Sequence, residues 1–240
     1  MLSATVLNHQ LRKRRNTMAL YRISDLNVEI KTNSPTLAEN IRRYEVDYQA
    51  TPNITLEMSD DRLIEMMEEY EGMTADKVEA LYMATLYSWA IFDFNGFPIR
   101  AVGVENDGEC TLFAAPDDRA IDLSMMIPRD KAFVYHYPGI RMQDDDYYVF
   151  DTPFGDLGGA SVTGKKLKLK SIVFVDSKRF DSLRAIEAKD FVPLFMHAVS
   201  QNVRQERTKH TLFILERVMH RVKFFGVGDV NDMDFILERV

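Results

Sequence analysis

The sequence is short of several features that define whole classes of protein. Its 240 residues include one cysteine, Cys110, so no disulfide can form within the chain, and such a count is typical of a reducing compartment. The longest apolar run, about residues 80–92, is interrupted by polar residues, whereas a membrane-spanning helix needs roughly 20 apolar residues. Basic residues are the minority, 30 against 37 acidic ones, and nucleic-acid binding relies on a basic surface. We therefore expect a cytoplasmic protein with no membrane span and no nucleic-acid partner.

What the sequence does contain is typical of a globular domain. Hydrophobic residues make up 46% and charged residues 28%, and the length fits one large domain. Residues 1–17 differ, because they include four consecutive basic residues at 12–15 and no acid. We expect this stretch to be a disordered basic tail, as chain termini often are. The alternatives are an arm that touches a partner or an anionic surface, or an upstream start with Met18 as the natural first residue.

Hydrophobic periodicity predicts a mixed α+β protein. The expected strands are 21–30 (one strand or a bent pair), 54–58, 97–104, 110–114, 132–136, 139–142, 147–151, 167–175 and 222–227. The expected helices are 63–67 with a cap at 59–61, 74–94, 119–126, 191–199, 212–219 and 231–240. Ser34-Pro35 is expected to break the first strand region. We expect an N-terminal strand and helix region at 18–96 and a core at 97–240, together forming one compact unit.

Five short phrases carry a resemblance to a known family. They are 97–104 (FPIRAVGV), 112–116 (LFAAP), 137–141 (YPGIR), 151–155 (DTPFG) and 171–176 (SIVFVD). Their order and spacing resemble the HPr kinase and ATP-type phosphoenolpyruvate carboxykinase superfamily, in particular small bacterial relatives with an N-terminal strand-and-helix region. The resemblance covers about residues 18–240. It implies a P-loop core with a mixed, strand-rich sheet flanked by helices.

The phosphate-binding loop of that family is degenerate here. Relatives continue the 112–116 phrase with Ser-Gly-Thr-Gly-Lys-Ser-Thr, in which glycines let backbone N–H groups approach phosphate and the lysine and hydroxyl serve phosphate and magnesium. This chain has no glycine, lysine or hydroxyl at those places, and its degenerate loop positions are Pro116, Asp117, Asp118, Arg119 and Asp122. Like charges about 4 Å apart repel by roughly 1 kcal/mol in water and more where water is excluded. Asp117 and Asp118 would therefore oppose a polyphosphate.

Two further catalytic elements differ from the family pattern. Arg100 stands where the resemblance implies a histidine, and Val134 to Tyr137 replace an Asn-Asp-Asp segment whose acids serve magnesium and proton transfer. His136 lies in this segment and can accept a proton near neutral pH, but it offers magnesium no carboxylate. Arg141 matches the family.

Three lost elements predict a kinase-like protein that is catalytically inactive and acts by binding, sensing or regulating a partner. ATP and magnesium binding are expected to be weak or absent, with no metal site. The expected partners are a protein, a small anionic ligand or further copies of the chain. The alternative is an enzyme with displaced chemistry, in which His136 acts as a base and arginines hold a phosphorylated or carboxylated substrate. Its candidate arginines are Arg100, Arg119 and Arg141.

Other motifs have ordinary explanations. Residues 159–166 fit most of a Walker A pattern but precede an expected strand, and such a loop must open a helix. The lysines at 165, 166, 168 and 170 form a basic patch for an acidic partner or a solvated strand face. The acids at 144–146 bind a cation or simply fill a turn. Cys110 is expected to be buried and inert, and the histidines show no zinc-ligand spacing.

Overall fold

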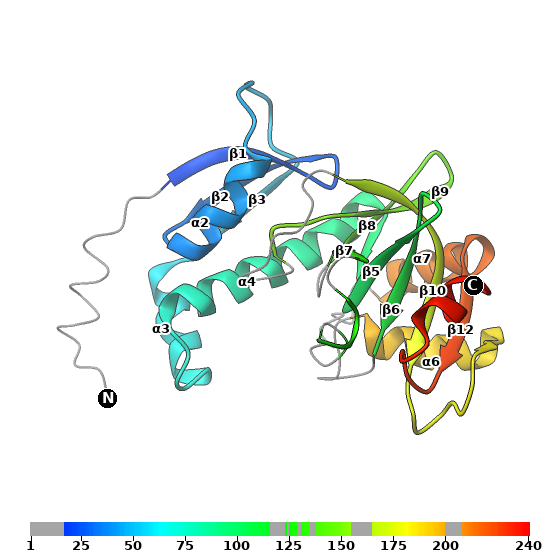
Figure 1. The fold of residues 1–240 in the computed structure, drawn as a ribbon. Helices are drawn as coiled ribbons and strands as arrows, with labels where there is room; N and C mark the ends of the chain where they lie inside the picture. Colours follow the sequence, from blue (N-terminus) through cyan, green and yellow to red (C-terminus); the bar gives the residue numbers. More distant parts are fainter. Residues whose placement is uncertain are drawn as a thin grey trace.

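The computed structural model describes residues 17–115, 123, 125–128, 131–134, 138–154, 165–199 and 208–240. These residues form a three-stranded and a nine-stranded β-sheet with six α-helices (Figure 1). The basic tail, residues 1–16 with the arginines and lysine at 12–15, lies outside the described residues.

The small sheet is built on a hairpin. Strand β1 (Thr17–Ile23) pairs antiparallel with β2 (Leu26–Thr32), and β3 (Ile54–Glu57) pairs parallel with β2. Ser24 and Asp25 form the turn with φ of 50° and 59°, the left-handed conformation that two-residue hairpin turns require. The predicted region 21–30 is thus a pair of strands.

Helices pack against the buried face of this sheet. They are α2 (Pro35–Ile41), the 3₁₀ turn η1 (Arg42–Tyr44), α3 (Asp60–Glu69), α4 (Ala75–Ala90) and the 3₁₀ turn η2 (Ile91–Phe94). Ser34 caps α2 by accepting a hydrogen bond from the Leu37 amide at 3.0 Å, and Pro35 takes the first turn, where no amide donor is needed. Ser34-Pro35 therefore begins a helix, which the sequence interpretation as a simple break missed.

The long helix α4 and the turn η2 together cover the helix predicted at 74–94. Thr74 caps its start, and Asn95 takes a left-handed conformation after η2. Three large apolar residues of α4, Leu81, Leu86 and Trp89, are only half-buried. The most deeply buried positions are Val78, Glu79, Ala80, Met83, Ala84, Tyr87 and Ser88. Several of these side chains are small, so neighbouring elements can approach the helix closely.

The large sheet has β10 at its centre. In order, its strands are β4 (Gly96–Pro98), β8 (Gly139–Gln143), β9 (Asp146–Phe150), β10 (Lys166–Val175), β6 (Glu109–Ala114), β5 (Ala101–Asn106) and β7 (Ala132–Val134), with β12 (Lys223–Val227) beside β10 and β11 (Arg184–Ala185) beside β12. One edge of β10 pairs parallel with β6. The other edge is shared between β9, antiparallel at 166–168, and β12, parallel at 171–175.

Chain continuity shows that this sheet is curled. Strands β4 and β5 lie far apart in the strand order, yet only residues 99 and 100 separate them in sequence. Three residue steps span at most about 11 Å, so the sheet must bend to bring its ends near each other. The single strand predicted at 97–104 is wrong, because the segment supplies two strands with different partners.

Helices cover both faces of the large sheet. Alternate residues of a strand face opposite sides: Leu112 and Ile172 pack with α6 (Ala188–Ala198) and α7 (Thr208–Arg221). Phe113 and Val173 pack with Leu123, Ile127 and α8 (Met233–Leu237). The expected mixed, strand-rich sheet flanked by helices is confirmed. Within the described residues, no helix combines the length and hydrophobicity that crossing a membrane would demand.

Candidate functional site

The carboxyl ends of the parallel strands form the candidate site. β6, β10 and β12 run in the same direction, and their registers place Ala114, Phe174 and Gly226 side by side. In open α/β sheets, ligands bind outside the carboxyl ends of the strands. We call the residues at this end of β6, β10 and β12 the carboxyl edge.

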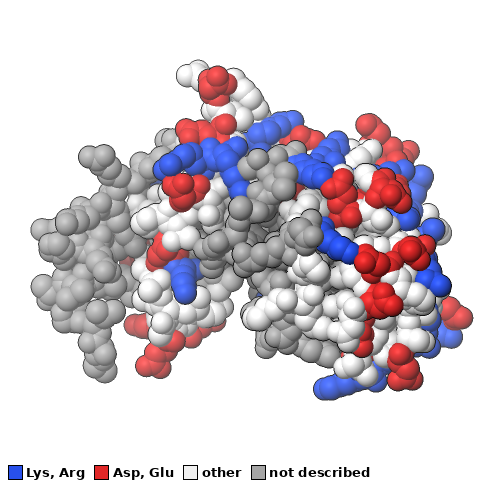
Figure 2. Space-filling model, in the orientation of Figure 1, with Lys and Arg blue, Asp and Glu red and all other residues white. Residues whose placement is uncertain are grey.

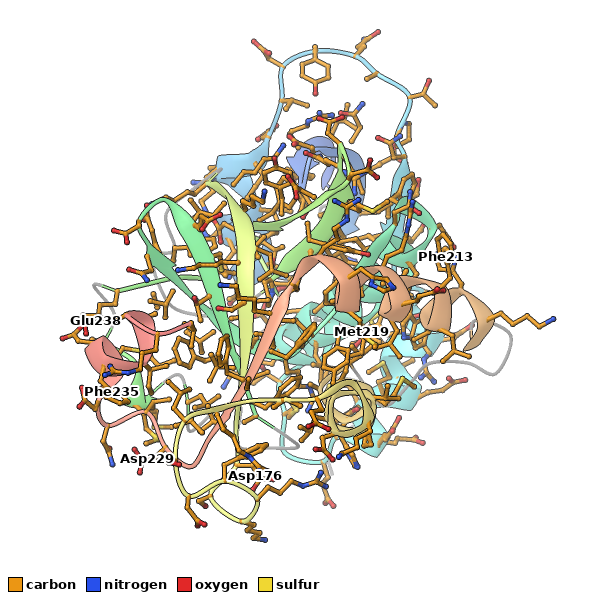
Figure 3. The ribbon with its side chains drawn as sticks, turned by 90° about the vertical axis from the view of Figure 1, so that its right-hand side faces the viewer. Asp176, Phe213, Met219, Asp229, Phe235 and Glu238 are labelled. Atoms are coloured by element: carbon orange, nitrogen blue, oxygen red, sulfur yellow. The ribbon has the colours of Figure 1, made fainter. Side chains whose placement is uncertain are left out.

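Asp176 directly follows β10 at the carboxyl edge and is 4% exposed. Its Oδ1 accepts a hydrogen bond from the Lys178 amide at 3.0 Å, and its Oδ2 lies 3.4 Å from Arg179 Nε. The Asp176 amide donates to the carbonyl of Val227 at 2.9 Å, which joins the ends of β10 and β12. The carboxylate therefore stabilises the turn that follows its own strand (Figure 3).

Two glycines allow close packing in the same region. A Cβ on Gly226 would lie 2.4 Å from the ring of Phe180, and one on Gly228 would lie 2.6 Å from the Phe180 carbonyl oxygen. The turn after β10 is therefore packed directly onto the end of β12. This close packing keeps Asp176 in its position.

Arg100 flanks the carboxyl edge from the antiparallel strand β5. Ala101 pairs with Ala114, so Arg100 lies next to the point where β6 ends. The Arg100 amide donates to the Ala198 carbonyl at 3.2 Å, at the end of α6. Its half-buried side chain has an Nε atom that is shielded from solvent and has no hydrogen-bond partner among the described residues. A buried N–H without a partner costs about 1–3 kcal/mol, so this atom is a candidate for ligand contact.

Most other predicted site residues lie outside the described residues. These are Pro116, Asp117, Asp118, Arg119, Asp122 and His136. The structure describes their flanks. Ala115 is buried after β6, residues 123, 125 and 126 are helical, and Val134 pairs with Gly103 in β7. Because β6 and β7 both run antiparallel to β5, the last described residues of both strands lie at the end of the sheet where Arg100 lies.

Arg141 lies elsewhere, between the two sheets. On β8 it pairs with Gly96, and its Nη1 donates to the Ser24 carbonyl at 2.6 Å while Nε donates to the Phe94 carbonyl at 3.2 Å. Its guanidinium also lies over the Phe94 ring, 5.9 Å from the centroid. Burial lowers the pKa of Arg141 below its usual value. Arg141 and Arg100 share no partner in the described structure, so the structure does not bring these two predicted residues together.

Sequence reasoning missed the contact surface around Arg141, which we call the hairpin seam and define by Ser24, Tyr87, Gly139 and Arg141. The Tyr87 hydroxyl and the Ser24 hydroxyl are 2.6 Å apart, and burial raises the pKa of Tyr87. A Cβ on Gly139 would lie 2.0 Å from Ser24 Oγ, so only glycine lets the hairpin approach β8. No local sequence signal marks the seam, because its members are far apart in the chain.

A second polar contact joins the two regions near the seam. The Tyr44 hydroxyl donates to Oδ2 of Asp151 at 2.5 Å, and both residues are buried. Burial, and then the charge of Asp151, raise the pKa of Tyr44. Asp151 belongs to one of the phrases behind the family resemblance, and here it takes part in joining η1 to the end of β9.

The lysine-rich strand is a charge-balanced face. Lys165 pairs with Glu105, Lys166 lies 3.5 Å from Asp25, and Lys168 lies 2.8 Å from Asp146. Figure 2 shows basic and acidic side chains interspersed on the visible surface. The solvated-face interpretation fits better than a basic patch. Residues 159–164 of the Walker A-like segment lie outside the described residues, and Lys166 begins strand β10, where a phosphate loop would be followed by a helix.

The remaining candidates have structural roles. Asp144 and Asp145 have positive φ and form the β8–β9 turn. Cys110 is fully buried, and burial raises the pKa of its thiol, which opposes nucleophilic use. His210 Nε2 donates to the Phe92 carbonyl at 2.6 Å. Within the described part of the chain, no three His, Cys, Asp or Glu residues gather as metal ligands.

At the carboxyl edge, the Asp176 carboxylate is thus engaged by its own turn, and Arg100 Nε has no hydrogen-bond partner among the described residues. Compared with protein-family models and with curated proteins, the chain matches none.

Proposed function

We propose that this chain is a catalytically inactive, kinase-like protein of the HPr kinase and phosphoenolpyruvate carboxykinase type that acts by binding or regulating a partner. The observation that carries the proposal is the place of residues 116–122 in the sequence. They come directly after Ala115, which follows β6, and β6 ends at the carboxyl edge; a phosphate loop likewise follows a strand in sequence. Their sequence supplies aspartates in place of glycine and lysine.

The environment of Asp176 supports the same conclusion. P-loop enzymes hold magnesium with an aspartate at the carboxyl end of a strand near the phosphate loop. Asp176 has that position, but its two oxygens contact the Lys178 amide and the Arg179 guanidinium. Using it for magnesium would break contacts that stabilise a buried charge.

Thermal-shift titration with ATP, ADP, GTP and pyrophosphate, each with magnesium, tests the proposal. A ligand at 100 times its dissociation constant stabilises the folded state by about 2.7 kcal/mol, and each kcal/mol shifts the Tm of a chain of this size by roughly 2–4 °C. We expect no saturable shift at millimolar ligand and no release of phosphate from ATP. A saturable shift that Asp176→Asn abolishes, or phosphate release that the same variant removes, would contradict the proposal.

The partner-free Nε of Arg100 favours a second function, an enzyme or sensor site for a small phosphorylated or carboxylated molecule. Such anions bind arginine through paired N–H donors. Inorganic phosphate and citrate are the probes. Stabilisation by either that is lost in Arg100→Gln and retained in Arg184→Gln, an exposed control, supports this site. Equal stabilisation of both variants rules it out.

A further inference from the structure

Helix α7 has two distinct faces. One face packs against the large sheet and buries Thr211, Ile214, Leu215 and Val218. The other carries exposed residues that include two large apolar side chains, Leu212 at 51% and Phe213 at 47% exposure. We call this second set the outer stripe, and its exposed members are Lys209, Leu212, Phe213, Glu216 and His220.

The outer stripe follows helical geometry. At 3.6 residues per turn, its five positions fall within about 100° of the helix circumference, roughly opposite the buried face. Figure 3 shows α7 at the side of the molecule, with Phe213 and Met219 on different turns. Arg217 lies over the Phe213 ring at 5.0 Å from the centroid, and the centroid of the His210 ring lies 6.3 Å from that of Phe213, yet Phe213 keeps 47% exposure. Adjacent large apolar side chains on one exposed helix face are typical of an interaction surface.

The charged residues of the outer stripe indicate which partner would bind it. Lys209 lies one helical turn before the Leu212–Phe213 pair, and Glu216 lies one turn after it. Within the described residues, no ion pair engages either charge. A stripe with a cation at one end, an anion at the other and apolar residues between them is complementary to an inverted copy of itself. Such self-complementarity is the requirement for a two-fold interface.

We propose that the outer stripe is the interface of a homodimer in which two α7 helices pack antiparallel. A two-fold axis between Leu212 and Phe213 places Leu212 of one copy against Phe213 of the other. The same axis places Lys209 against Glu216 of the second copy at both ends. This inference is independent of the proposed function, because it uses no residue of the carboxyl edge.

The dimer is expected to be weak and concentration-dependent. The helix α7 has 14 residues and is therefore about 21 Å long at 1.5 Å per residue. Two helices of this length that touch along one stripe bury less surface than the roughly 800 Å² per partner of a standard interface. We expect dissociation constants in the micromolar range.

Sedimentation equilibrium of the full chain between about 1 and 200 μM, in low salt, tests the proposal. Lys209→Glu places two acids opposite each other, and Glu216→Lys places two bases opposite each other, so each single variant should weaken the dimer at least about tenfold. The double variant Lys209→Glu/Glu216→Lys restores the opposite charges and should return the dissociation constant to within about threefold of the wild type. Phe213→Gln should also weaken the dimer, whereas Phe235→Gln, a change at an exposed phenylalanine on α8, should not.

The changed side chains are exposed, so circular dichroism should show the same fold for all variants. A wild-type chain that stays monomeric at 200 μM overturns the proposal and leaves the stripe to another protein. A dimer whose affinity is unchanged by both single charge reversals also overturns it, because association then uses a different surface.

Discussion

Replacing Arg141 with methionine tests the role of the hairpin seam most directly. The guanidinium donates to two backbone carbonyls, of Ser24 and Phe94, that belong to different parts of the chain. Methionine fills much of the same volume but donates no hydrogen bond. If Arg141 joins the hairpin to the large sheet, its loss should lower the free energy of unfolding rather than affect a ligand.

The expected loss of unfolding free energy in Arg141→Met follows from the hydrogen bonds that the guanidinium makes. Hydrogen bonds that involve a charged group contribute about 1.5–3 kcal/mol each. Arg141 is half-buried, so water replaces part of what is lost, and we expect a net loss of about 2–4 kcal/mol. For a chain of this size that corresponds to a decrease in Tm of very roughly 4–16 °C.

Urea unfolding followed by circular dichroism gives the measurement. Arg22→Met is the matched control, because Arg22 lies on the same hairpin, is exposed and, among the described residues, forms a hydrogen bond with Asn27 and an ion pair with Asp25 and no bond to the large sheet. It should change stability by less than about 0.5 kcal/mol. The free energy of unfolding of Arg141→Lys should lie between those of Arg141→Met and Arg22→Met. If Arg141→Met is as stable as the control, the seam contributes nothing to folding and the argument from its geometry is wrong.

Three further predictions concern stability. Burial raises the pKa of four buried tyrosines, Tyr21, Tyr44, Tyr87 and Tyr147, and that of Tyr147 reaches about 12. Above pH 10 the unfolded chain therefore binds fewer protons than the folded chain. The free energy of unfolding should fall by roughly 1.4 kcal/mol per pH unit for each of Tyr44, Tyr87 and Tyr147 between pH 10 and pH 12, with a smaller contribution from Tyr21. Urea unfolding between pH 9 and 11.5 should show a constant contribution below pH 10, a decline above it, and a shallower decline in Tyr147→Phe; a flat profile would refute the assignment. Gly96→Ala should cost about 1–3 kcal/mol, measured as a lower Tm, because its Cβ would lie 2.5 Å from the Ile140 carbonyl oxygen; an unchanged Tm would mean that β4 and β8 are not this close. Glu79→Met should cost about 1–3 kcal/mol in urea unfolding, because Oε1 of the buried carboxylate accepts from the Thr32 hydroxyl at 2.8 Å and the Asn33 amide at 2.7 Å and methionine leaves both donors without this acceptor; an unaffected midpoint would contradict that role.

Local chemistry predicted much of the fold. Ser59 caps α3 from the expected cap segment 59–61, and Thr74 caps α4 at the start of the expected helix. Asp107-Gly108, a sequence typical of a two-residue hairpin turn, joins the expected strands β5 and β6 with positive φ at both residues. These signals act over a few residues, so they can be read from sequence. The expected strands from 110 to 175 also match observed strands, since apolar alternation reports burial on a sheet.

Contacts between residues that lie far apart in the sequence could not be predicted. The apolar pattern of 97–104 is continuous, so nothing local indicates that Arg100 interrupts it and that its halves join different neighbours. Arg141 was predicted from the family resemblance as a site residue, but its partner Ser24 is 117 positions away. At the carboxyl edge, the sequence identified Arg100 as a candidate, whereas the engagement of Asp176 by Arg179 required the turn after β10 to be seen in three dimensions.

The divided edge of β10 has a consequence for synthesis of the chain. Its segment 171–175 (SIVFV) pairs on one side with β12, whose first residue lies 52 positions later. Translation at about 5–20 residues per second leaves that backbone edge open for several seconds in the nascent chain. The segment is rich in β-branched and aromatic residues, the composition that promotes strand addition between molecules. A ribosome that stops before residue 223 would therefore release an incomplete chain with an unpaired, aggregation-prone strand edge. Protection of the nascent chain by a chaperone matters most during the seconds before β12 is made.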